Sequence, residues 1–217
     1  SAGLSIGSMI KGAIVTAGIG TAIKQSITAG GALEQSIGGI ETLFKDSAGT
    51  VRKYADDAYK TAGISANSYM EQVTSFSASL LSSLGGDTAK AAKAADMAII
   101  DMADNANKMG TPIEEIQRAY QGFAKGNYQM LDNLKLGFAG TKGGMEDLLK
   151  EATKLSGVEY NIDNLDDVFN AIHVVQTELG ITGTTALEAT ETIEGSLSAM
   201  KAAFENTLGA LAIGENV

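Results

Sequence analysis

Few residues of this 217-residue chain have the types and spacings that chemistry requires. There is one histidine, His173, and no cysteine, so disulfides, thiolate metal sites and cysteine nucleophiles are excluded. A Ser-His-Asp triad or a histidine-based metal site would depend on His173 alone. Because His173 stands beside Ile172, Val174 and Val175, we predict a structural role for it.

Three carboxylates form the next candidate group. Asp96, Asp101 and Asp104 lie in one predicted helix, where only Asp101 and Asp104, three residues apart, share a face. We expect a solvated helix face here rather than a metal site. The sequence therefore predicts no catalytic, metal-binding or cofactor-binding residue, no cofactor and no enzyme activity.

The glycines at Gly137, Gly140, Gly143 and Gly144 could suggest a phosphate-binding loop. They lack the lysine-serine or lysine-threonine ending of one such loop and the strand leading into GxGxxG of the other. We interpret them as turn residues.

The aromatic residues Tyr120, Phe123, Tyr128 and Phe138 could stack on nucleic-acid bases if a basic groove accompanied them. The net charge of −10 and the pI near 4.6 provide no such groove. We expect these rings to be core anchors and expect no direct sequence-specific nucleic-acid binding.

The elements that position these residues are predicted to be helices. The chain is 44% hydrophobic, which is enough for a core, and it has one proline and only 6% aromatic residues. This composition favours an all-α, multi-helix bundle-like domain with short glycine-rich turns. Apolar periodicity and capping residues predict helices over about 47–62, 66–84, 88–109, 145–155, 165–179 and 186–211, and another that begins after Thr111.

Two capping boxes are predicted, one at Thr111 and Glu114 and one at Thr185 and Glu188. The glycine- and aromatic-rich segments 121–128 and 133–144 are expected to be compact turns. Residues 158–162 form the one segment with β-like character.

The last predicted helix carries apolar residues at intervals of three and four, which indicates a continuous stripe. This stripe is either a seam for oligomerisation or extension, or an ordinary core face. It consists of Ile193, Leu197, Met200, Phe204, Leu208 and Leu211.

Residues 1–45 differ in character from the body at 46–211 and from the short tail at 212–217. They are rich in glycine and alanine, and Lys11 is the one charged residue between Leu4 and Ile23. A membrane-spanning helix is one interpretation. Because the many glycines and the central lysine lower its hydrophobicity, we favour a helix that becomes ordered by packing on identical copies or on a partner.

Several stretches resemble one known family. They are SLGGDTAKAAKAADMAIIDMADNANKMGT, AYQGFAKGNYQMLDNLKLGF, GTKGGMEDLL, AIHVVQTELGITGTTALEATETIEGS and MKAAFENTLGAL. Together they resemble the phage tail tape measure proteins of prophages in low-GC Gram-positive bacteria, over roughly residues 46–211. One departure is Gly143-Gly144, where the family favours a more polar turn and where we expect a looser helix start.

The resemblance implies a structural virion component that lies in the lumen of the phage tail and in the host cytoplasm during assembly. It implies tail length determination, genome ejection, and a chain that is one segment of a larger protein. The implied partners are further copies of the chain, the tail tube, tail tip and tail assembly chaperone proteins, with host membrane contact during ejection.

Two other classes of function were weighed. A membrane-active, pore- or channel-forming helical protein would account for the apolar N-terminal residues. A peptidoglycan-degrading domain would require paired carboxylates in a cleft or a metal site, and the lone histidine and absent cysteine disfavour it.

Overall fold

The computed structural model describes residues 31–191 and 193–213, and within them the side chains of 189–198, 211 and 212 are not described. All regular elements in this part of the chain are helical, which confirms the all-α prediction. Residues 31–44 are helical. The elements that follow are η1 (Lys45–Ser47), α2 (Ala48–Thr61), α3 (Ala66–Ser83), α4 (Thr88–Met109), α5 (Ile113–Phe123), η2 (Leu131–Leu134), α6 (Lys142–Ser156), α7 (Leu165–Glu178), α8 (Thr184–Glu191) and α9 (Ile193–Ala212).

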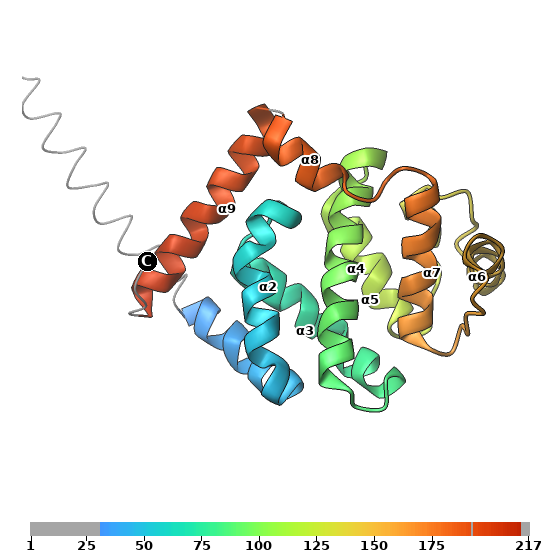
Figure 1. Cartoon of the computed structure of the whole chain (residues 1–217), viewed down its shortest axis with the longest axis horizontal. Helices are drawn as coiled ribbons and strands as arrows, with labels where there is room; N and C mark the ends of the chain where they lie inside the picture. The colour runs from blue at the N-terminus through green and yellow to red at the C-terminus, as the bar shows by residue number, and fades with distance from the viewer. Residues whose placement is uncertain (1–30, 192, 214–217) are drawn as a thin grey trace, which may run out of the picture.

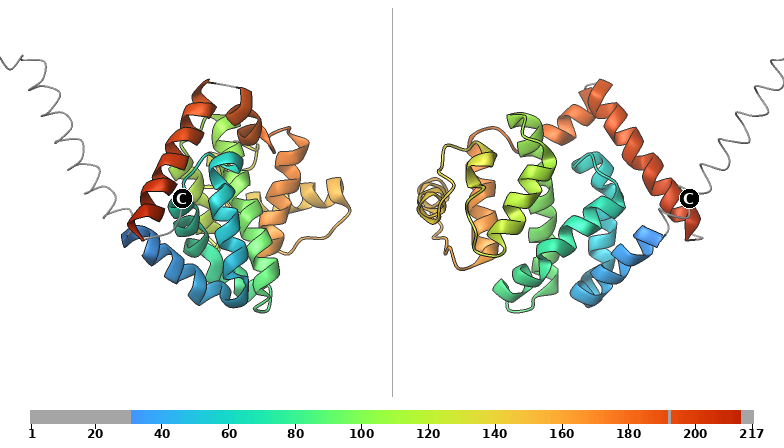
Figure 2. Two further views of the ribbon diagram at one scale, coloured as in Figure 1. Left: turned by 60° about the vertical axis from the view of Figure 1, so that its left-hand side comes forward. Right: turned by 180° about the vertical axis from the view of Figure 1, so that it is seen from behind.

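Helix α4 occupies the centre, in contact with α2, α3, α5, α7 and α8 (Figures 1 and 2). Its alanines make this possible, because small side chains let neighbouring helices approach closely. Ala91, Ala92, Ala95 and Ala98 are completely buried. Helix α6 packs on α7 at one end of the molecule, and α8 and α9 form an arm at the other end that lies against α2 and α3.

Local capping signals place several helix ends where the sequence predicts them. The side chain of Ser65 accepts a hydrogen bond from the backbone N–H of Ser68 at the start of α3, and Asp87 accepts one from Lys90 at the start of α4. Gly110 ends α4 in the left-handed conformation, with φ of 70°. These ends depend on residues within one turn of each other.

Both predicted capping boxes are wrong. The hydroxyl of Thr111 donates instead to the carbonyl oxygen of Asn133, 3.0 Å away, and α5 starts after Pro112 without a side-chain cap. Thr185 lies inside α8 rather than before it. At α2, Ser47 ends a 3-10 turn that follows helix 31–44, and its hydroxyl bonds to that of Thr88 instead of capping.

The other irregular segments agree in part with the predictions. Residues 158–162 form an irregular connection, not a strand, between α6 and α7. Segment 121–128 starts within α5 and continues as a turn, whereas segment 133–144 starts within η2, crosses an irregular loop and ends within α6.

The core extends into residues that the sequence places in the N-terminal segment. Leu33, Ile40 and Phe44, all on helix 31–44, are buried in the same hydrophobic cluster as the central helices. Packing therefore begins before residue 46. The apolar run between Leu4 and Ile23 lies outside the described residues, and in the described part no helix combines the length and the hydropathy needed to cross a membrane.

Candidate functional site

The carboxylates of α4 are buried, so the prediction of a solvated face is wrong for Asp101 and Asp104. Their exposed fractions are 1% and 0%, whereas Asp96 is half-buried. The reason is the central position of α4, which has helices on several sides. Each carboxylate meets a donor from another element, and this pairing is what makes burial of a charge tolerable.

Asp104 binds the start of α8. One carboxylate oxygen accepts a hydrogen bond from the backbone N–H of Gly183 at 2.6 Å, and the other accepts from Thr185 at 2.8 Å. The side-chain amide of Asn107 donates to the hydroxyl of Thr185 at 2.8 Å. A negative charge at a helix N-terminus also interacts favourably with the helix dipole. Asp104 therefore caps α8 from a distant part of the sequence.

Asp101 pairs with the one histidine. The Nδ1 atom of His173 on α7 lies 2.9 and 3.1 Å from the two carboxylate oxygens of Asp101. The hydrogen bond with Asp101 raises the pKa of His173 above 6.5, and burial raises the pKa of Asp101. Next to the pair, Gln176 donates to the carbonyl oxygen of Asp101, and Asn105 donates to the side chain of Gln176. This network joins α4 to α7.

A shallow pocket of about 280 Å³ lies beside the pair, lined by Tyr54, Lys93, Asp96, Met97, Ile100, Asp101 and His173. A histidine oriented by a carboxylate can act as a general base. The lining residues, however, include no serine, threonine or cysteine that it could activate. No cluster of three or more potential metal ligands occurs in the described part of the chain. The pocket therefore brings the His173–Asp101 pair to a lining that is otherwise largely apolar.

The predicted aromatic anchors are confirmed in three of four cases. Tyr120, Phe123 and Tyr128 are buried, whereas Phe138 is only partly buried at the edge of the core. The rings of Tyr120 and Phe123 lie 5.5 Å apart, and Tyr120 also contacts Phe169 of α7 at 5.2 Å. These rings fill the space between α5 and α7 and are not available to stack on bases.

Two of the four glycines make close backbone contacts. A Cβ atom on Gly140 would overlap the carbonyl oxygen of Gln129, and one on Gly144 would overlap that of Ala139. Gly144 lies in the first turn of α6, where its N–H donates to the capping hydroxyl of Thr141. The expected loosening of this helix start is thus wrong, because Gly144 lets the preceding loop pack directly on α6.

Helix α9 turns two large apolar residues, Met200 and Phe204, away from the body. Met200 and Phe204 are 69% and 61% exposed, whereas Ala202 and Gly209 are buried against the body. The side-chain oxygen of Asn206 accepts the N–H of Ala66 at 2.7 Å, which holds α9 to the start of α3. The core-face interpretation of the predicted stripe is therefore wrong for Met200 and Phe204.

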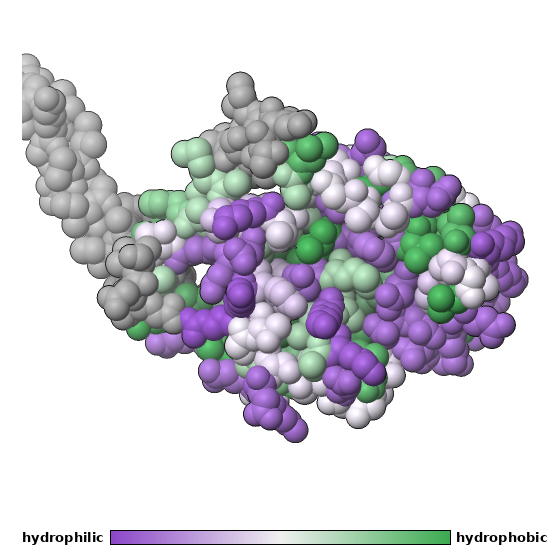
Figure 3. All heavy atoms as spheres, viewed as in Figure 1, coloured by the Kyte–Doolittle hydropathy of each residue, from purple (hydrophilic) through white to green (hydrophobic). Residues whose placement is uncertain are grey.

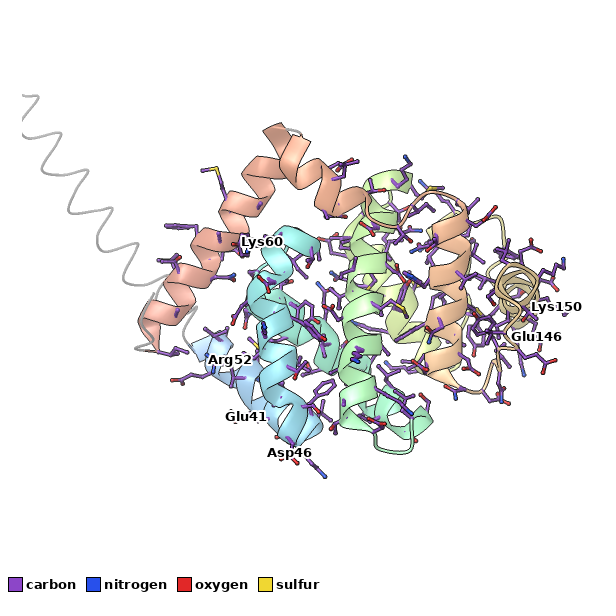
Figure 4. All side chains as sticks on the ribbon, in the orientation of Figure 1. Glu41, Asp46, Arg52, Lys60, Glu146 and Lys150 are labelled. Atoms are coloured by element: carbon purple, nitrogen blue, oxygen red, sulfur yellow. The ribbon has the colours of Figure 1, made fainter. Side chains whose placement is uncertain are left out.

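Two views of the side chains agree with the exposure of apolar residues on α9. Figure 3 shows hydrophobic residues along α9 at the edge of the molecule, and Figure 4 shows side chains projecting from the outer side of this helix. The labelled Glu146 and Lys150 on α6 lie at the opposite end. The sequence predicted the stripe but not its direction, and it gave no signal for Asn206 as a cap of α3.

Comparisons of the chain with protein-family models, with curated proteins and with solved structures produce no match. Two features remain as candidates for function. One is the polar network of α4 with its shallow pocket, and the other is the apolar outer face of α9.

Proposed function

We propose that this chain is a structural, protein-binding segment of a phage tail tape measure protein, with roles in tail assembly and length determination and in genome delivery. The resemblance of residues 46–211 to that family motivates the proposal. The observation that supports a protein-binding role is the exposure of Met200 and Phe204 on α9. Large apolar side chains that are adjacent on a surface often mark a site of protein contact.

The polar network supports a structural role rather than a chemical one. Asp104 uses both carboxylate oxygens to bind backbone N–H groups of the same chain, and Asp101 is engaged by His173. These buried polar groups join α4, α7 and α8 to one another. We accordingly propose no catalytic activity and no cofactor.

Helix dimensions indicate which part this segment plays in a molecular ruler. An α-helix rises about 1.5 Å per residue, so residues 46–211 would span about 250 Å as one continuous helix. The longest described helix is instead α4, with 22 residues and a length of about 33 Å. A compact segment adds little length. Its role in the ruler is therefore docking, with further copies of itself or with tube, tip or chaperone proteins as partners.

Virions provide the test of this proposal. Phage particles would be purified after induction of a strain that encodes the chain, and their proteins identified by mass spectrometry. We expect peptides from residues 46–211 in intact tails and their loss from particles that have ejected their genome. Absence from intact tails, together with release of dye from liposomes by the purified chain, would favour the membrane-active alternative instead.

A further inference from the structure

The exposed residues Met200 and Phe204 of α9 lie opposite the face of this helix that packs on the body. At about 100° per residue, the six predicted stripe positions fall within an arc of about 80° centred roughly opposite Ala202. Ala202 and Gly209 are buried, and Gly209 lies against Leu33 of helix 31–44. The exposed Met200 and Phe204 occupy the middle of the stripe. The body therefore leaves Met200 and Phe204 uncovered.

The stripe has a symmetry that points to its partner. Its spacings read almost the same from either end, with the centre close to residue 202. We propose that α9 pairs with α9 of a second copy in an antiparallel, two-fold symmetric arrangement. Met200 then packs against Phe204 of the partner subunit, and the stripe positions 193 and 197 lie opposite 211 and 208 of the partner subunit. This is the layering of an antiparallel coiled coil.

The charges beside the stripe favour the antiparallel direction. Lys201 and Glu205 are both exposed and lie on the same flank of the stripe. In an antiparallel pair the same flanks of the two helices meet, so Lys201 approaches Glu205 of the partner subunit twice, once on each side of the axis. In a parallel pair this flank would instead meet the opposite one, which carries Ala203 and Thr207.

A second copy also satisfies the steric and electrostatic conditions. Among the described residues the body lies on the other side of α9, so two copies joined along this helix would keep these parts of their bodies apart (Figure 2). Each copy carries a net charge of −10, which opposes association. Two local lysine-glutamate contacts offset part of that repulsion where the helices touch. This pairing is a specific form of the self-association that the proposed function includes. It rests on the proposed function only for its place in the phage tail.

The full chain in solution provides the first test. Sedimentation equilibrium over a concentration series should show a monomer-dimer equilibrium, and Met200→Glu with Phe204→Glu should weaken dimerisation at least tenfold. Lys201→Glu alone and Glu205→Lys alone should each weaken it, and the double exchange should restore it. Lys150→Glu, which changes an exposed lysine on α6, is the matched control for charge. Circular dichroism verifies that each variant remains helical.

Disulfide trapping provides the second test. Because the chain has no native cysteine, only the introduced cysteines can form disulfides. A mixture of Met200→Cys and Phe204→Cys chains should form mixed dimers faster than either variant forms dimers with itself. Faster trapping of Met200→Cys with itself would indicate a parallel pair and overturn the proposal. A monomer at every concentration, or association unchanged by the two glutamates, would do the same. None of these results bears on whether the chain is present in virions.

Discussion

Replacing Asp104 by asparagine tests whether the start of α8 is held by a carboxylate from α4. The two oxygens of Asp104 accept the N–H groups of Gly183 and Thr185, at 2.6 and 2.8 Å. Asparagine has nearly the same shape but one acceptor oxygen. Its amide nitrogen therefore faces a backbone donor, and one N–H group at the helix start loses its partner.

The expected cost follows from the bonds that are lost. A hydrogen bond to a charged group contributes about 1.5–3 kcal/mol, and a negative charge at a helix N-terminus adds about 0.3–1 kcal/mol. Removing a buried charge offsets part of this loss. We expect the free energy of unfolding to fall by about 2–3 kcal/mol. At about 2–4 °C per kcal/mol for a domain of this size, the melting temperature falls by about 4–12 °C.

Asp87 supplies the matched control. It caps α4 through one oxygen, which accepts the N–H of Lys90 at 2.9 Å, and it is partly exposed instead of buried. Asparagine caps as well as aspartate at such a position, so Asp87→Asn should leave the melting temperature nearly unchanged. Thermal and urea unfolding would be followed by circular dichroism at neutral pH, and hydrogen exchange would be measured at the first amides of α8. Equal stability of the two variants, with unchanged exchange in α8, would refute the role assigned to Asp104.

Three further predictions concern the core. Gly144→Ala should lower the melting temperature because the added Cβ would overlap the backbone carbonyl of Ala139. Gly143→Ala makes no close contact and should raise the free energy of unfolding by up to about 1 kcal/mol. Equal effects of the two substitutions would contradict the packing of Gly144. Tyr120→Phe should leave the free energy of unfolding unchanged or raise it, because the buried hydroxyl of Tyr120 has no described partner. Tyr69→Phe should lower the free energy of unfolding by about 1.5–3 kcal/mol, because it removes the hydrogen bond to the carboxylate of Asp96. Chemical denaturation of both variants measures the difference. Since the pKa of His173 is raised, its protonated form stabilises the fold below about pH 6.5, and this contribution disappears as the pH rises through the raised value. The difference in melting temperature between the wild type and His173→Gln should therefore shrink as the pH rises above about 6.5, and a constant difference would contradict the ion pair.

Helix ends were predictable where their signals are local. Ser65 and Asp87 cap within their own first turns, and Gly110 ends its helix through its own conformational freedom. The start of α8 was not predictable in this way. Thr185 and Glu188 have the spacing of a capping box, but Asp104, 81 residues earlier, supplies the acceptor for the N–H of Thr185.

Burial was harder to predict than helicity, because a sequence does not show how many sides of a helix are covered. The spacing of Asp101 and Asp104 correctly placed them on one face of α4. That face is buried because α7 and the start of α8 bring His173 and two N–H groups to it. A polar pattern in the sequence is the same whether its partners are water molecules or donors from other helices.

Burial was also hard to predict for the stripe on α9, where apolar residues expected to be covered are exposed. Its periodicity predicted a continuous apolar face, yet Met200 and Phe204 are exposed and Ala202 faces the body. Small residues on the inner face let α9 lie close to α2 and α3. The sequence alone did not reveal that the smaller residues would make the internal contact.

The attachment of the α8–α9 arm determines how the chain responds to tension. Polar contacts hold the arm at both of its ends, through Asn206 at the start of α3 and through Asp104 at the start of α8, and Ala202 and Gly209 of α9 are buried against the body. A force applied through the residues after α9 acts on the Asn206 contact first and reaches Asp104 only after α9 has peeled away. Tension from that side is therefore carried first by the contacts of α9 and only later by those of α8, which join the arm to the central helix α4.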